Sequence, residues 1–304
     1  MEAARPRRGD DRRRPRRLAP GRRRVSAVEP SPEALRDAAI EAANAGAAVL
    51  ARWFRSERLE VGTKGANDFV TQADRESEAA VVAAILGRFP EHRILAEEGT
   101  AHLAATSDHE WVIDPLDGTT NFLQGLPVWA VSIACRRAGE LLAGVVLDPE
   151  GGNLFAAARG AGATWNGRPM RVSSRPALDG AFLATGYPFR ARAVLDPYLE
   201  LLRAVFARAR AVRRCGAAAL DLAWTAAGVY DGFFELRLSP WDIAAGALLV
   251  EEAGGRLADF GGGDDYLASG NVLAGTPGVL AGLLETVRQC GIDEALIDSL
   301  APRG

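Results

Sequence analysis

Apolar and polar positions follow a helical period in some stretches of the chain and alternate in others. The first helical stretch begins at Ser31-Pro32-Glu33, where Ser caps the helix, Pro fits its first position and Glu complements the dipole of the first turn. Helical spacing continues to about Arg55. A second helix is predicted from about residue 74 to residue 86, because Gly87 and Pro90 end it.

Alternating segments, which predict strands, dominate from about residue 93 to residue 171. Short strands are expected at RILAEEG and at EWVID. Four more follow, separated by short turns: VWAVSIACRR, LLAGVVLD, NLFAAARG and ATWNGRPM. Strands that follow one another without an intervening helix are typical of an antiparallel meander.

After about Val172 strands and helices alternate, which predicts an α/β arrangement. The expected order is the strand AFLATG, a helix over about 195–210, a short strand, the helix GAAALDLAWTAAG, the strand DGFFEL and the helix WDIAAGALLVEEAGG. We therefore predict a disordered arginine-rich tail over 1–25, an α+β subdomain over 26–172 and an α/β subdomain over 173–304. A cleft between the two subdomains is the expected place for a ligand.

Composition adds limits to this picture. Hydrophobic residues make up 48% and charged residues 25% of the 304 positions, as is usual for soluble globular proteins. No apolar run approaches the roughly 18–20 residues of a membrane helix. An odd number of widely spaced cysteines, three in all, favours buried thiols in a reducing, cytoplasmic setting. The three histidines lie between residues 92 and 109 without the spacing of a zinc site.

Charge is distributed unevenly along the chain. Residues 1–24 hold eleven arginines against three acidic residues, whereas the whole chain has a net charge of −3. The tail therefore carries +8 and the remainder −11, so the folded part is expected to repel nucleic acid and attract cations. The tail has no aromatic or helical pattern, which favours a solvated leader over a nucleic-acid-binding arm.

Acidic residues stand at the ends of several predicted elements. If these ends converge in the fold, the carboxylates need a positive ion among them, because closely spaced buried charges of one sign are costly. Hard cations such as Mg²⁺ prefer carboxylate and carbonyl oxygens. The acidic positions are Asp74 at a helix start, Glu97-Glu98 and then Asp114 and Asp117 at strand ends, and Asp242 at another helix start.

The stretch WVIDPLDGTTNF, residues 111–122, has the composition that such a site needs. The Pro stiffens the corner so that Asp114, Asp117 and the Leu116 carbonyl can face one centre, and Gly118 permits a close backbone approach. If a helix begins at Thr119, its free N–H groups point at the same centre and suit a phosphate. The residues alone leave two interpretations open, a capped turn and a metal–phosphate site.

Together, WVIDPLDGTTNF, AEEG and PWDIAAGALLVEEAGG resemble the inositol monophosphatase family of Mg²⁺-dependent, Li⁺-sensitive phosphomonoesterases. RRCGAAALDLAW, YDGFFE and LSPWD are most similar to its bacterial inositol-1-monophosphatase branch. The resemblance extends from about Ser31 to the C-terminal region. It implies an α+β fold, a layered α/β/α/β/α sandwich of the sugar-phosphatase type shared with fructose-1,6-bisphosphatase, and by analogy a homodimer.

The resemblance also implies roles for residues, with two to three Mg²⁺ ions per site. The first ion is expected on Glu97, Asp114 and the Leu116 carbonyl, the second on Asp114, Asp117 and Asp242, and a weaker third on Glu97. Thr119, paired with Glu97, is expected to orient or deprotonate the attacking water, and Asp74 to hold Thr119. The expected substrate contacts are Asp117, Gly118, Thr119, Gly216, Ala217, Ala218 and Glu235, with Lys64 on a mobile loop over 62–67 that closes on the metal.

Three departures from the family pattern leave the substrate open. The Lys64 loop is one residue shorter than in some relatives. Ala217 stands where many relatives have Ser or Thr, and Gln124 where many have His. Inositol 1-phosphate or a related small polyol or sugar phosphate is the expected substrate, and histidinol phosphate or another small phosphorylated metabolite is the alternative. A different class of function, nucleic-acid binding or regulation through the arginine-rich tail, is the remaining alternative.

Overall fold

The computed structural model describes residues 29–57, 59, 61–65, 68–99, 101–102, 107–189 and 191–300. The predicted disordered tail over 1–25 lies outside the described residues. Residues 31–304 form one compact unit by their internal contacts. The predicted division of this unit at residue 172 stays a prediction.

The first two helices begin at capping residues that are visible in the sequence. Helix α1 (Pro32–Trp53) is capped by Ser31, whose hydroxyl accepts a bond from Ala34 N at 3.3 Å. Helix α2 (Gln72–Arg88) begins with a capping box in which Thr71 and Asp74 bond reciprocally. Both helices start within two residues of the predicted positions, and they pack against each other.

The larger sheet has eight strands in the order β10-β9-β8-β7-β6-β5-β3-β4. The predicted meander is confirmed, because β5 to β10 pair antiparallel in sequence order, whereas β3 runs parallel to β5. The strands are β3 (Arg93–Ala96), β4 (Ala101–His102), β5 (His109–Asp117), β6 (Ala130–Arg137), β7 (Glu140–Asp148), β8 (Asn153–Ala158), β9 (Gly162–Trp165) and β10 (Arg168–Pro169).

The smaller sheet has five strands in the order β12-β11-β13-β15-β14. Strand β11 runs parallel to β12 and β13, and the β13–β15 and β15–β14 pairs are antiparallel, so the second half is a mixed sheet. Its strands are β11 (Phe182–Thr185), β12 (Ala211–Arg213), β13 (Gly232–Glu235), β14 (Arg256–Ala258) and β15 (Val272–Gly275).

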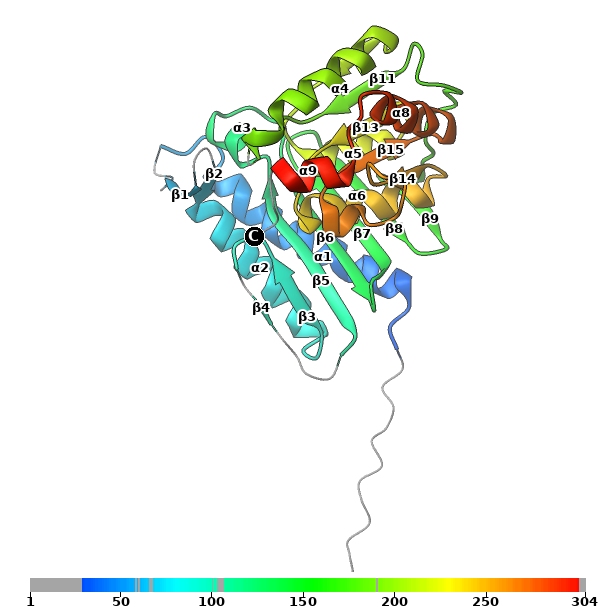
Figure 1. Ribbon diagram of the computed structural model, residues 1–304. Helices are drawn as coiled ribbons and strands as arrows, with labels where there is room; N and C mark the ends of the chain where they lie inside the picture. Colours follow the sequence, from blue (N-terminus) through cyan, green and yellow to red (C-terminus); the bar gives the residue numbers. More distant parts are fainter. Residues whose placement is uncertain are drawn as a thin grey trace, which may run out of the picture. The chain divides into compact units, whose positions relative to one another are not determined.

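Helices cover both sheets and produce five layers (Figure 1). Helices α1 and α2 lie on the larger sheet, α5 (Ala218–Ala226) and α6 (Pro240–Glu252) lie between the sheets, and α4 (Leu195–Arg208) and α8 (Pro277–Gln289) cover the smaller sheet. Successive strand residues face opposite sides, so Phe233 packs into the core with α5 and α6 while Phe234 packs with α4 and α8. The predicted layered α/β/α/β/α sandwich is confirmed.

Small residues allow α6 to lie close to the larger sheet. A Cβ placed on Gly144 of β7 would stand 2.8 Å from the carbonyl oxygen of Ala245 in α6. Trp111 and Trp129 are fully buried in the core. The cysteines are free, but only Cys135 is buried, and the other two are half-buried rather than buried as predicted. Among the described helices none is long and apolar enough to span a membrane.

The remaining elements are short and mostly connect the larger ones. They are β1 (Val61–Gly65), β2 (Asp68–Thr71), α3 (Thr119–Leu123), the 3₁₀ turn η1 (Arg192–Val194), α7 (Tyr266–Ser269) and α9 (Glu294–Leu300). Strands β1 and β2 pair antiparallel. The predicted loop over 62–67 is therefore wrong in part, because Lys64 lies in β1. Residues 66 and 67 and the side chain of Lys64 lie outside the described part of the chain, so its predicted closing motion stays a prediction.

Candidate active site

The corner after β5 is shaped by a break in strand pairing. The register between β5 and β6 shifts between Asp114 and Asp117, so the two carboxylates leave the regular alternation of the strand. Leu116 N donates to Asp114 Oδ1 at 3.0 Å, and Ser77 of α2 donates to the Pro115 carbonyl at 3.0 Å. These bonds fix the corner from inside and from the neighbouring helix.

Gly118 allows the chain to turn from the corner into α3. Its φ of +91° lies in the left-handed region, and a Cβ there would stand 2.9 Å from the Val128 carbonyl oxygen. A helix does begin at Thr119, as expected, but it has only five residues. Asn121 of α3 donates to the carbonyls of Val128 and Cys215, at 2.8 and 2.9 Å, and so joins this corner to the segment before α5.

The Thr119 hydroxyl lies between two acceptors. Its Oγ1 is 3.1 Å from the Leu116 carbonyl oxygen and 3.2 Å from Asp74 Oδ1. The other carboxylate oxygen of Asp74 accepts bonds from Thr71, which caps α2. Asp74 therefore orients Thr119 from the start of α2, and the carbonyl oxygen of Leu116 keeps a second lone pair for another ligand.

Asp242 reaches the corner from the first turn of α6. Pro240 occupies the first turn, and Ser239 N donates to Asp242 Oδ2 at 2.7 Å in a capping box. Asp114, Asp117 and Asp242 are all buried, and an oxygen of each lies within 4.8 Å of an oxygen of the others. The structure thus brings together three of the acidic residues that stand at separate element ends in the sequence.

The pKa values of these carboxyl groups reflect their close spacing. Burial raises the pKa of Asp114 well above its ordinary value, and Glu97, Asp117 and Asp242 raise it further. Burial and the charge of Asp242 raise the pKa of Asp117 to about 7, although the Ala219 N–H, 2.8 Å from its Oδ2, opposes the shift. A cation among these oxygens would offset the repulsion, and an all-oxygen donor set fits Mg²⁺.

The carboxylates open into a cavity of about 330 Å³. Asp74 contacts Thr119, which lines the cavity. The side chain of Lys64 lies outside the described residues. The remaining predicted site residues all line this cavity: Glu97, Asp114, Leu116, Asp117, Gly118, Thr119, Gly216, Ala217, Ala218, Glu235 and Asp242.

Glu235 stands at the end of β13, on the side of the cavity formed by the smaller sheet. The carboxylate is buried, and a Cβ on Gly186 would collide with it, so a side chain after β11 would displace the carboxylate from this position. Burial raises the pKa of Glu235 well above its ordinary value, and Asp221 and Asp242 raise it further. An acceptor group with this placement suits a hydroxyl of a substrate.

The cavity also has lining residues that sequence reasoning did not assign to the site. Asp221 on α5 is buried and lines the cavity. Arg214 lies 5.5 Å from the centre of the Tyr187 ring, and both line the cavity, as does Arg237. Arg214 stands two residues before Gly216, and Arg237 two after Glu235. Proximity to predicted contacts was the only signal in the sequence.

The sequence pattern of the Inositol monophosphatase family matches residues 31–291. The Nus factor SuhB of Pseudomonas aeruginosa is 49% identical over 243 residues, which cover 77% of this chain and 90% of that protein. Among solved structures, the extragenic suppressor protein suhB of Bartonella henselae is 40% identical with a TM-score of 0.81, covering 84% of this chain and 99% of that one.

A second solved structure is named for an enzyme. The inositol monophosphatase of Anabaena is 37% identical with a TM-score of 0.76, and the match covers 84% of this chain and 96% of that one. The match to the family pattern, the relatives and the shared fold agree with one another. This chain belongs to the inositol monophosphatase family.

Proposed function

We propose that the chain is a cytoplasmic, Mg²⁺-dependent and Li⁺-sensitive phosphomonoesterase that hydrolyses inositol 1-phosphate or a closely related small polyol phosphate. The proposal rests on one observation: carboxylate oxygens of Asp114, Asp117 and Asp242 lie within 4.8 Å of one another beside a cavity. Membership of the inositol monophosphatase family supports the same reaction class.

In this proposal the oxygen donors of the site hold two to three Mg²⁺ ions. Glu97, Asp114 and the Leu116 carbonyl would hold the first, and Asp114, Asp117 and Asp242 the second, with a weaker third on Glu97. When bound, the cations lower the pKa of a water and offset the negative charge of the phosphate and the leaving alkoxide.

The chain's own groups would then orient the reactants. Thr119, held by Asp74 at 3.2 Å, positions the attacking water, and Glu97 accepts its proton. The N–H groups of Gly118 and Thr119 bind the phosphate.

The leaving alcohol would lie on the side of the smaller sheet. Glu235 accepts a bond from one of its hydroxyl groups, and the backbone over 216–218 lies against it. Lys64 is proposed to approach the site from the β1–β2 segment.

Phosphate release from inositol 1-phosphate tests the proposal. Release is expected to require Mg²⁺, to fall in Li⁺, to disappear in EDTA and to fall steeply in Asp117→Asn. Activity that survives EDTA, or that Asp117→Asn leaves at the wild-type level, would contradict the metal mechanism. A panel that includes histidinol phosphate tests the substrate: a much larger kcat/KM for histidinol phosphate than for inositol 1-phosphate would replace the first choice with the alternative.

We also propose that the protein is a homodimer. Leu195, Leu199 and Phe206 on α4 are 41%, 46% and 65% exposed, and large apolar side chains on one helix suit the surface of a second copy. Sedimentation velocity is expected to show a dimer. Phe206→Asp should shift it toward the monomer, and a wild-type monomer at micromolar concentration would contradict the proposal.

A regulatory role is the second candidate function, favoured by the name Nus factor that the P. aeruginosa relative carries. In that role the arginine-rich tail is the segment expected to contact nucleic acid. Deletion of residues 1–24 separates the candidates. The enzyme predicts unchanged turnover, whereas the regulatory role predicts loss of a nucleic-acid affinity that depends on salt.

A further inference from the structure

Four residues connect the two elements, β13 and α6, that carry the carboxylates of Glu235 and Asp242. We call residues 236–239 the connector. They join Glu235 at the end of β13 to the start of α6, where Asp242 lies. Three of the four, Leu236, Arg237 and Leu238, line the cavity themselves. The course of this short segment therefore sets where both carboxylates stand.

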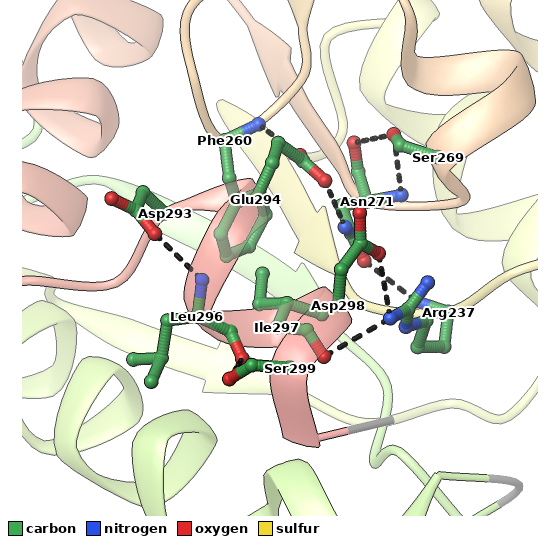
Figure 2. Close-up of polar contacts among 10 residues, drawn as sticks. All are labelled: Arg237, Phe260, Ser269, Asn271, Asp293, Glu294, Leu296, Ile297, Asp298 and Ser299. Carbon is green, nitrogen blue, oxygen red and sulfur yellow. Dashed lines mark hydrogen bonds and ion pairs between the residues drawn. The ribbon is translucent and has the colours of Figure 1, made fainter. Parts of the chain in front are cut away.

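The C-terminal helix α9 holds the connector through Arg237 (Figure 2). One guanidinium nitrogen of Arg237, Nη2, donates to Asp298 Oδ1 at 2.9 Å and to the Ile297 carbonyl at 3.1 Å. The side chain of Arg237 is 9% exposed and that of Asp298 44%, so the arginine end of this contact is shielded from water and the carboxylate end is exposed. Charge-assisted bonds are stronger than bonds between neutral groups.

A second tie joins the backbone of the same residue to α9. Arg237 N donates to Asn271 Oδ1 at 3.1 Å, and Asn271 Nδ2 donates to Glu294 Oε2 at 2.6 Å (Figure 2). The other carboxylate oxygen of Glu294 accepts Phe260 N at 3.1 Å. Asn271 is fully buried beside β15. Helix α9 thus constrains Arg237 by its side chain and, through Asn271, by its backbone.

The backbone of Arg237 has a conformation that its side chain disfavours. Its φ is +61°, in the left-handed region, which is energetically unfavourable for an L-residue with a side chain. Glycine adopts this region without that cost. A non-glycine residue persists in such a conformation where its surroundings over-determine it. The ties to α9 are the contacts that hold this residue in place.

The connector passes this constraint on to Asp242. Leu238 N donates to the Gly270 carbonyl at 2.9 Å, and the next residue, Ser239, donates its N–H to Asp242 Oδ2 at 2.7 Å. The carboxylate of Asp242 is therefore oriented by a backbone group two residues after Arg237. A shift of the connector would move that group and with it the carboxylate.

We propose that Arg237 is a positioning residue whose bonds to α9 hold the connector so that Asp242 and Glu235 face the cavity together. The importance of Asp242 for metal binding rests on the proposed function. The contribution of α9 to the site does not involve contact with the substrate.

The test compares three variants of the full chain. Arg237→Gly removes the side-chain tie, keeps the backbone N–H that bonds to Asn271, and relieves the backbone strain, so it separates positioning from stability. Asp298→Asn weakens the same contact from α9 without altering the connector. The matched control is Asp179→Asn, which alters an Arg–Asp pair of the same length, 2.9 Å, between Asp179 and Arg208 of α4.

Mn²⁺ alone, followed by its electron paramagnetic resonance signal, reports on the site without substrate, because it accepts the same oxygen ligands as Mg²⁺. We expect Arg237→Gly to bind Mn²⁺ about tenfold more weakly, in line with losses seen when the support of a ligand is removed. Asp298→Asn should show a smaller loss and Asp179→Asn none. Thermal unfolding of Arg237→Gly should stay near that of the wild type.

Turnover provides a second readout. With inositol 1-phosphate and limiting Mg²⁺, kcat of Arg237→Gly should fall and recover as Mg²⁺ is raised, which a general loss of folded protein would not produce. Wild-type Mn²⁺ affinity in both Arg237→Gly and Asp298→Asn would overturn the inference. If Arg237→Gly does not fold, Asp298→Asn decides alone.

The two proposals fail in different ways. A wild type that binds Mn²⁺ but releases no phosphate contradicts the proposed function, and the Mn²⁺ comparison among variants still tests Arg237. A wild type that binds no Mn²⁺ contradicts both.

Discussion

The two halves of strand β5 carry buried acids in opposite electrostatic settings. Glu110, near the start of the strand, lies 2.8 Å from Arg93, and its other carboxylate oxygen accepts two bonds from Arg136. Asp114, four residues later, has Glu97, Asp117 and Asp242 as the neighbours that raise its pKa. Both acids are at least nine-tenths buried.

This difference separates a structural acid from a site acid. Arginines of the neighbouring strands compensate Glu110 inside the protein, so its charge contributes to sheet pairing. The charged groups that shift the pKa of Asp114 all have its own sign, which costs folding energy and leaves a place for a cation. Both residues are buried, so burial does not distinguish them. They differ in the sign of the charges on the neighbouring side chains.

The largest effect is expected when one negative charge is removed from the acidic end of β5. Asp117→Asn should lower kcat for phosphate release by about 10²–10³-fold, because the electrostatic support of the transition state is lost. The metal-free variant should also unfold at a higher temperature than the metal-free wild type, since one repelling charge is gone.

The control for Asp117→Asn is Asp148→Asn. Asp148 is also buried, but it accepts the Gly151 N–H at 2.8 Å in the hairpin between β7 and β8 and is not among the residues that line the cavity. This variant should lose stability and keep its activity per folded molecule. Equal losses of activity in the two variants would remove the distinction between site acids and structural acids.

Metal removal should have the next largest effect. A cation that binds only the folded state stabilises it by about 2.7 kcal/mol at a concentration one hundred times its dissociation constant. The midpoint of thermal unfolding should therefore rise when Mg²⁺ replaces EDTA in the wild type and rise much less in Asp117→Asn. An identical rise in both proteins would place the bound ions elsewhere.

The structural end of β5 should respond in the opposite way. Glu110→Gln leaves Arg93 and Arg136 without their shared carboxylate and should destabilise the protein by about 1–2 kcal/mol, less than a fully buried pair because both arginines keep contact with solvent. Activity per folded molecule should not change. Urea unfolding measures the effect, and Glu41→Gln, at the exposed pair with Arg88, should be nearly neutral.

The smallest effect is expected from pH at the ring stack beside Glu110. His92 stacks on His109 and accepts the Trp111 indole N–H at 3.0 Å. Burial, with His109, lowers the pKa of His92 to about 4. A folded-state pKa below the unfolded value gives stability that is present above about pH 6.5 and is lost as pH falls toward about 4.

Comparison with His92→Gln isolates this contribution. Between pH 6.5 and 5.5 the wild type should lose about 1 kcal/mol more than the variant, measured by urea unfolding at each pH. Parallel losses in the two proteins would show that His92 does not carry the dependence.

Local signals in the sequence were sufficient for most elements and for much of the site. Ser31 and the Ser239–Asp242 box start helices because their side chains bond to nearby backbone groups, and alternation marks β6 to β9 because each strand faces two environments. The segment around Lys64 is the exception. Its glycines suggested a loop, yet pairing with β2 makes part of it a strand.

What the sequence by itself determined is therefore the chemistry of short stretches: the elements, the Asp-Pro-Leu-Asp-Gly-Thr corner and, through resemblance, the acids that belong together. Only the tertiary structure decided their distances, because Asp242 meets Asp114 and Asp117 through the packing of α6 on the larger sheet. The tie from α9 to Arg237 is of the same kind. Arg237 and Ile297 are sixty residues apart in the sequence. No local sequence pattern predicts their bond, because only the packing of the fold brings the two residues together.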